Sequence, residues 1–271
     1  MCHSRLHNCI SSAASDVYKN QELCGFQPRA ELIQSFPLDA TCTIAPALSA
    51  KNLGFYFDCK LNLDTQLDNV SKICYINLRN IGRIGRHLTK ELKIQLVHST
   101  IFSILDNGNA TYGGLTSGQL NRLQKIQNAA VRFIFGLHGK RCREHISPYL
   151  KELHFLPVFY RIRYKIALLV FKCLNNEGTK YLSELIKPNQ GLRQCVRKND
   201  DCFLLMTPPR PNYTRTNGAF TYTAPAVWNN LPYGIRCMSE RNKFKTALKT
   251  HYFRKAFKDS ETAYNDVLLL V

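Results

Sequence analysis

Apolar residues recur at three- to four-residue intervals along much of this chain, and this spacing restricts its fold more than any other feature. From Asp64 onward the spacing matches one face of an α-helix, with Asp64 placed to cap the start and Gly82 and Gly85 loosening the end. The residues predicted to face inward are Leu67, Val70, Cys74, Leu78 and Ile81. Lys72 and Arg79 are left on the outer face.

A second helix is predicted to start at Thr89 and to stop near the turn formed by Asn107 and Gly108. Its inward residues are expected to be Leu92, Leu96 and Ile101. The pattern therefore predicts two consecutive helices that contribute apolar faces to one core.

The third helix has the clearest start signal in the sequence. Thr116 and Gln119 have the spacing of a capping box, in which each side chain bonds the backbone N–H of the other residue. Gly136 is placed to end the helix in the left-handed conformation. The residues predicted to share its inner face are Leu120, Leu123, Ile126, Ala130 and Phe133. Arg122, Lys125 and Arg132 then point elsewhere and are available to phosphates.

Two more helices follow, a short one that begins at Ser147 and Pro148 and a longer one after Pro157. The longer helix carries an apolar stripe, with Arg161, Lys165 and Lys172 within roughly 40° of one another beside it. Tyr160 and Tyr164 lie on the other flank, where we expect packing rather than base stacking. The inward residues of this helix are predicted to be Val158, Ile162, Ile166, Leu169 and Cys173.

A final helix is predicted after Ser239, with Phe244, Leu248 and Tyr252 inward. Arg241, Lys245 and Lys249 recur every four residues along this helix and form a second basic ridge.

The remaining segments are less periodic. The first fifty residues show no sustained pattern, and Leu53 to Phe57 reads as a short strand. The segment from Lys187 to Asn217 contains several prolines and is predicted to be an irregular linker. Gly218 to Trp228 is expected to pair as a strand and turn, anchored by the single tryptophan.

Positive charge is concentrated in the second half of the chain. The protein has 271 residues and a formal net charge of +18, and residues 119–258 hold 26 basic and 7 acidic residues. A segment with this excess repels itself when folded, so an anionic polymer that neutralises it is the favoured partner. A solvated basic surface without a partner is the alternative explanation.

The 11 cysteines follow no disulfide framework, and no secretory leader or membrane-spanning stretch is evident. We therefore expect an intracellular protein of the nucleus, the cytoplasm or both, with free thiols. Two Cys/His groups contain zinc-binding side chains: Cys2 with His3, His7 and Cys9, and His138 with Cys142 and His145. Their spacings fit no zinc module, so no metal site and no cofactor is predicted.

Three long blocks stand in order along the chain: RLQKIQNAAVRFIFGL (Arg122–Leu137), ELHFLPVFYRIRYKIALLVFKCLN (Glu152–Asn175) and GAFTYTAPAVWNNLPYGIR (Gly218–Arg236), preceded by KNLGFYFD (Lys51–Asp58). Together these blocks resemble the region that follows the palm in polymerases of LINE-type (non-LTR) retrotransposons of the jockey group. The resemblance covers about residues 30–258.

This resemblance implies a mainly α fold, α+β with a few short strands, in which a helical thumb-like bundle precedes a smaller C-terminal helical module. Residues 1–58 would be a poorly defined segment with the last edge of the palm, and residues 59–178 the thumb-like domain. Residues 179–217 would be a proline-containing linker, and residues 218–271 the C-terminal module.

The catalytic carboxylates of a polymerase are not evident. Polymerisation needs carboxylates that hold two divalent metal ions, Mg²⁺ in the parent family. The only adjacent aspartates, Asp200 and Asp201, lack the flanking strand pattern and are predicted to form a solvated turn. No endonuclease domain and no other catalytic motif is evident. We expect no catalytic residue in this chain.

The sequence therefore predicts a part of a retrotransposon-derived RNA-directed DNA polymerase that lacks the palm and the endonuclease and binds nucleic acid without sequence specificity. Its partners would be RNA or an RNA/DNA duplex, together with a palm domain if one is encoded separately. The alternative is a domesticated helical module that binds another protein and no nucleic acid. The predicted nucleic-acid contacts are Arg122, Lys125, Arg132, Arg161, Lys165, Lys172, Arg241, Lys245 and Lys249.

Overall fold

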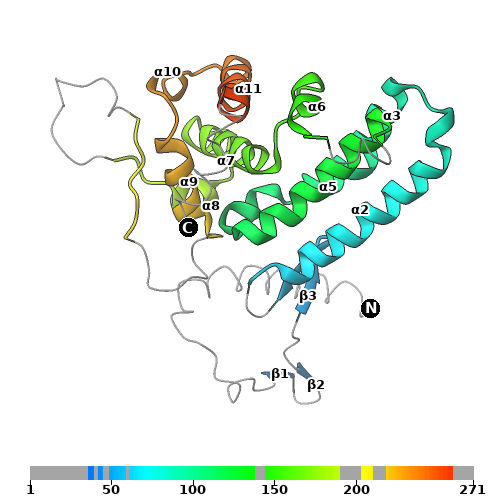
Figure 1. Ribbon diagram of the computed structural model, residues 1–271. Coiled ribbons are helices and arrows are strands. Elements are labelled where there is room, and N and C mark those ends of the chain that lie inside the picture. Colours follow the sequence, from blue (N-terminus) through cyan, green and yellow to red (C-terminus); the bar gives the residue numbers. More distant parts are fainter. Residues whose placement is uncertain are drawn as a thin grey trace. The chain divides into compact units, whose positions relative to one another are not determined.

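The computed structural model describes residues 36–39, 42–44, 49–58, 61–137, 144–189, 203–209 and 218–258 (Figure 1). Helices make up 70% of this interpretable part, and the strands within it form two-stranded pairs. The prediction of a mainly α fold with a few short strands is confirmed. The chain divides into two compact units, Met1–Leu48 and Ser49–Val271.

The first unit contains one described hairpin. Its strands β1 (Phe36–Asp39) and β2 (Cys42–Ile44) pair antiparallel, and the register opposes Phe36 to Ile44.

The second unit begins with another antiparallel hairpin, β3 (Ser49–Asn52) and β4 (Phe55–Asp58). The predicted single strand from Leu53 to Phe57 is wrong in its first part. Leu53 and Gly54 form the turn, both with positive φ, because the chain must reverse between the two strands. The turn places Phe55 in the core, where its ring centroid lies 5.8 Å from that of Tyr112.

The next helices, α2 (Asp64–Ile84) and α3 (Lys90–Val97), are separated by the 3₁₀ turn η2 (Gly85–His87). The predicted inward residues Leu67, Val70 and Cys74 of α2 are buried. The start of α2 differs from the prediction: Leu63 is the cap residue, and the carboxylate of Asp64 accepts a 2.8 Å hydrogen bond from Gln119 Nε2 on α5.

A π-helical segment, η3 (His98–Phe102), joins α3 directly to α4 (Ser103–Leu105). Asn77 Nδ2 of α2 donates a 3.0 Å hydrogen bond to the carbonyl of Thr100 in this segment. The prediction that Leu92 faces inward is wrong, since its side chain is 45% exposed. Leu92 and Ile101 are nine residues apart, which is about 180° around a regular α-helix, so one helix face cannot bury both.

The 3₁₀ segment η4 (Asn109–Gly114) leads to α5 (Ser117–Phe135), whose predicted limits are confirmed. Thr116 Oγ1 accepts from the N–H of Gln119 at 3.4 Å, and Gln119 Oε1 accepts from the N–H of Thr116 at 3.0 Å, so both halves of the capping box are present. Gly136 ends the helix with φ of 63°. Leu123, Ile126 and Ala130 are buried, and α5 packs along α2 (Figure 1).

The short helix α6 (Ser147–Glu152) precedes α7 (Val158–Leu174), and α8 (Lys180–Leu185) follows it. The predicted stripe of α7 is buried at Val158, Ile162, Ile166 and Cys173. Packed against α5, η4, α9 and α11, α7 is the central helix of the unit (Figure 1).

Three helices complete the fold: α9 (Phe220–Asn229), α10 (Tyr233–Arg236) and α11 (Arg241–Lys258). The predicted strand and turn at Gly218–Trp228 is therefore wrong. Ala224, Val227 and Trp228 are buried at helical spacing, so packing against α7 outweighs the local strand propensity and the internal proline, Pro225. In α11 the predicted inward residues Phe244, Leu248 and Tyr252 are buried.

One apolar core extends through the second unit, from Phe55 of β4 to Tyr252 of α11. Residues 203–209 are tied to this core by α9. Trp228 Nε1 donates to the carbonyl of Phe203 at 2.8 Å, and the Asn229 amide bonds both the N–H and the carbonyl of Leu205 at 2.9 Å. The Trp-Asn-Asn-Leu-Pro string thus has a structural role. The domain limits at residues 58, 178 and 217 stay predictions.

Candidate nucleic-acid interface

Two of the predicted basic ridges lie on helices that pack together. The ring of Tyr160 on α7 lies 5.8 Å from that of Tyr252 on α11, and Phe171 stacks on Phe244 at 4.2 Å. These pairs run in opposite directions along the two helices, so α7 and α11 are antiparallel neighbours. Neither helix contains an acidic residue, and α5 contains none. The joined surface is therefore strongly cationic.

The two ridges approach each other around His98 of η3. His98 is exposed as a residue, but the neighbouring side chains partly desolvate its ring, and this desolvation lowers the pKa of His98 below its ordinary value of 6.5. The charge of Arg161 lowers the pKa further. Asp106 opposes this shift, and Lys249 on α11 adds to it. Residues from η3, α7 and α11 thus share one electrostatic environment. We refer to His98, Arg161 and Lys249 as the His98 cluster.

Aromatic rings hold two members of the His98 cluster, His98 and Arg161. The His98 ring meets Phe102 and Phe155 edge-on, each at 5.1 Å between centroids. The guanidinium of Arg161 lies 4.5 Å from the centroid of Phe102 and forms an ion pair with Asp106. Such cation–π and charge-assisted contacts hold the side chains in one arrangement before any ligand binds.

The nine predicted contact residues differ in their availability. Lys125, Lys165 and Lys249 are exposed, and none of them takes part in an ion pair among the described residues. Three others, Arg132, Lys172 and Lys245, are half-buried.

Three of the predicted arginines already have acidic partners. Arg122 pairs with Asp68 of α2, and Arg161 with Asp106. Arg241 lies 3.9 Å from Glu177, which follows α7. The Arg161 side chain is only 17% exposed, so it packs within the structure as well as contributing positive charge to the interface. The exposed lysines are the residues best placed to meet phosphate directly.

The tyrosines of α7 pack, as predicted. Tyr160 and Tyr164 are half-buried against the core, and burial raises the pKa of Tyr164. Sequence reasoning missed His98, whose position depends on the π-helical turn. It also missed Arg163, which lies 4.1 Å from the centroid of Phe159 and whose pKa is lowered by burial.

The part of the chain that the structure describes contains no group of three or more metal-ligating side chains. Asp200 and Asp201, the group Cys2, His3, His7 and Cys9, and the residues His138 and Cys142 lie outside the described residues. No described helix is long and apolar enough to cross a membrane.

Comparison with protein-family models, with curated proteins and with solved structures gives no match. The physical character of the interface therefore carries the functional argument. A surface of lysines and arginines on helices that contain no acidic residue can bind a polyanion through its repeated charges.

Proposed function

We propose that this chain binds RNA or an RNA/DNA duplex, without sequence specificity, through the cationic surface of α7 and α11, with α5 contributing further cations. We further propose that it derives from the region that follows the palm in LINE-type reverse transcriptases. The sequence blocks that support this origin fall on α5, α7 and α9, which pack around one core.

One observation carries the binding proposal: α7 and α11 lie side by side and contain no acidic residue. Bringing two such helices together costs Coulomb energy, which bound phosphates would recover. The lysines of the ridges are flexible point charges that suit a phosphate backbone better than base edges. Low sequence specificity follows from this chemistry.

The chain would grip nucleic acid and leave polymerisation to a palm domain with its own Mg²⁺ site. The expected act of the described residues is to hold a template and primer by their backbones. We assign them no catalytic role.

Fluorescence anisotropy with a labelled RNA/DNA duplex tests this proposal. If about five cations contact phosphates, the logarithm of the association constant should fall with the logarithm of salt concentration with a slope near −4.5. Duplexes of unrelated sequence should give the same affinity within about threefold. A slope near zero would remove the proposal.

A pair of variants locates the interface. Lys165→Gln with Lys249→Gln changes two exposed lysines, one on each helix, and should weaken binding of all sequences about tenfold at low salt. The matched control, Lys51→Gln with Lys72→Gln, makes the same change of charge outside the two helices. Equal losses in both variants would show that net charge, rather than this surface, governs binding.

The competing proposal is a helical protein-binding module. Heparin separates the two, since it should displace the duplex at the α7–α11 surface, whereas a chain that binds only protein would show no duplex signal to displace.

A further inference from the structure

Helix α2 presents apolar side chains to solvent along its outer face. Ile73, Ile76 and Ile84 are 36%, 48% and 50% exposed. At about 100° per residue they fall within an arc of roughly 80°, and they extend over about three turns. Branched aliphatic side chains in line on an exposed helix face mark an interaction surface more often than isolated ones do. We call these three residues the α2 stripe.

A row of cations borders the α2 stripe. Lys72, Arg79 and Arg83 are exposed and lie within an arc of roughly 40° on one side of it. None of the three takes part in an ion pair formed between described residues. The two acidic side chains of α2 lie nearer its start, where Asp68 pairs with Arg122 and Asp64 accepts a hydrogen bond from Gln119. The outer face of α2 thus combines an apolar line with unpaired positive charge.

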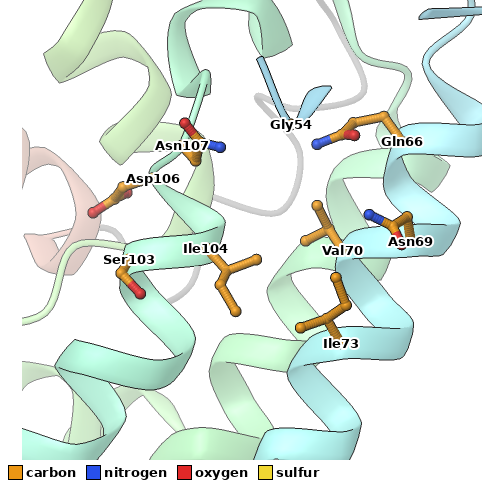
Figure 2. A pocket seen from close by; sticks show the side chains of 9 residues that line it. All are labelled: Gly54, Gln66, Asn69, Val70, Ile73, Ser103, Ile104, Asp106 and Asn107. Atoms are coloured by element: carbon orange, nitrogen blue, oxygen red, sulfur yellow. The ribbon is translucent and has the colours of Figure 1, made fainter. Parts of the chain in front are cut away.

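A hollow adjoins one end of the α2 stripe. It has a volume of about 380 Å³ and lies between α2 and α4 (Figure 2). Figure 2 shows Ile73 and Val70 of α2 facing Ile104 of α4 across the hollow, with the amide of Asn69 at the rim. The rest of the lining is formed by Gly54, Gln66, Ser103, Asp106 and Asn107, so the apolar wall is confined to the side of Ile73, Val70 and Ile104. An apolar side chain from a partner would lie against that wall.

From these three features we infer that the outer face of α2 is a docking surface for an acidic amphipathic helix of another protein. Apolar residues of that helix would cover the α2 stripe, one of them lying against the apolar wall of the hollow, and its Glu or Asp residues would pair with Lys72, Arg79 and Arg83. Helix-in-groove recognition uses this combination of spaced apolar anchors and flanking charge. The inference is independent of the nucleic-acid surface on α7 and α11.

Other occupants fit the surface less well. A second copy of this chain, paired through α2, would bring the same cations against one another, and like charges across an interface oppose association. Nucleic acid would satisfy the cations but would leave the aliphatic stripe uncovered, because isoleucine offers no π face for base stacking. An acidic helix satisfies both the charge and the apolar line.

Binding of three synthetic peptides of about 18 residues tests the inference. The first is an acidic helix with leucines in one stripe and glutamates beside it. The second carries lysine in place of every glutamate. The third is a scramble of the first, with equal charge and no stripe. Anisotropy at moderate salt should show the first peptide binding at least tenfold more tightly than either of the others.

Two variants of the full chain locate the binding site. Ile73→Ser with Ile76→Ser should remove at least tenfold of the affinity for the first peptide, and should leave duplex binding unchanged. Lys165→Gln with Lys249→Gln should do the reverse. Thermal melting by circular dichroism checks that each variant folds, which the exposure of all four side chains favours.

Equal binding of the scrambled peptide would overturn the inference, as would full peptide affinity in the isoleucine variant. Loss of duplex binding in Lys72→Glu with Arg79→Glu, without loss of peptide binding, would assign this face to nucleic acid instead. None of these results changes the salt dependence of duplex binding by the wild type, which tests the nucleic-acid proposal separately. The two proposals can therefore fail separately.

Discussion

The guanidinium of Arg161 lies 4.5 Å from the centre of the Phe102 ring and pairs with Asp106, so one side chain joins α7 to η3 and to the residue that follows α4. The Asp106 side chain is 29% exposed. Arg161→Gln removes the cation from both contacts and leaves a partly buried carboxylate with a weaker partner. We expect a loss of about 1–3 kcal/mol in the free energy of unfolding, measured by urea denaturation.

Lys165→Gln, one turn further along α7, is the matched control and should change this free energy by less than about 0.5 kcal/mol. Equal stability of the Arg161 and Lys165 variants would contradict the joining role of Arg161. The comparison also matters for binding studies, because a destabilised Arg161 variant would lose affinity both through the missing charge and through partial unfolding.

The His98 cluster predicts a pH dependence of stability. The folded-state pKa of His98 lies below its ordinary value of 6.5, so the unfolded chain binds the proton more readily. The contribution of neutral His98 to the free energy of unfolding is therefore present above pH 6.5. It is lost as the pH falls through 6.5 toward the folded-state pKa of His98. His98→Gln should reduce this decrease, measured by urea denaturation at several pH values. The charged groups that act on His98 are Arg161, Asp106 and Lys249.

Binding should show the opposite trend, since a phosphate near His98 favours the imidazolium. Each half unit by which bound nucleic acid raises the pKa of His98 corresponds to about threefold in affinity at low pH. The gain in affinity between pH 7.5 and pH 5.5 should thus be larger in wild type than in His98→Gln. The other histidines are the same in both proteins, so any difference between the two pH profiles of binding comes from His98. Identical profiles in wild type and His98→Gln would place the bound phosphate away from His98.

The amide of Asn229 holds residues 203–209 through two hydrogen bonds to Leu205. Asn229→Ala removes both and should cost about 1–3 kcal/mol, with faster hydrogen exchange at Leu205. Asn230→Ala is the control, because the exposed side chain of Asn230, which caps α9, donates to the carbonyl of Ala226 within that helix and not to residues 203–209. If exchange at Leu205 stays slow in Asn229→Ala, another contact holds this segment.

Gly108 and Gly136 both have a φ of 63° but differ in the space available for a side chain, so backbone strain can be separated from steric overlap. A Cβ at Gly136 meets no atom within 4 Å, whereas a Cβ at Gly108 would lie 2.8 Å from the Phe55 ring. Gly136→Ala should cost about 1 kcal/mol from the left-handed backbone alone. Gly108→Ala should cost at least about 1 kcal/mol more, because Phe55 is buried and has little room to move. Thermal melting of the two variants measures this difference.

Elements whose signals are local were predictable from the sequence. The limits of α5 follow from the capping box of Thr116 and Gln119 and from Gly136, all within the helix or next to it. The inner face of α11 follows from periodicity, since its buried residues form one stripe. On α7 the predicted stripe is buried except at Leu169, which is half-buried, and Ala167, Val170 and Phe171 are buried as well because this helix packs on several sides.

Features that depend on distant contacts were not predictable. The helix α9 forms because Trp228 and its neighbours pack on α7, a contact absent from the local pattern. Leu53 lies in a turn because β3 and β4 pair across it. The place of His98 beside Arg161 and Lys249 depends on a π-helical turn for which no sequence signal was recognised. The basic residues could be found in the sequence, but not which of them already have acidic partners.

The π-helical segment η3 also sets the rotation of α3 relative to α4 about their common helix axis. Removing one residue from His98–Phe102 would restore a regular α-helix and would rotate α3 by about 100° relative to α4. The carbonyl of Thr100 would then turn away from Asn77, and the imidazole of His98 would leave the surface shared by α7 and α11. A single extra residue thus allows one continuous helical segment to contact two neighbours. The carbonyl of Thr100 accepts a hydrogen bond from α2, and the imidazole of His98 lies near the charged residues of α7 and α11.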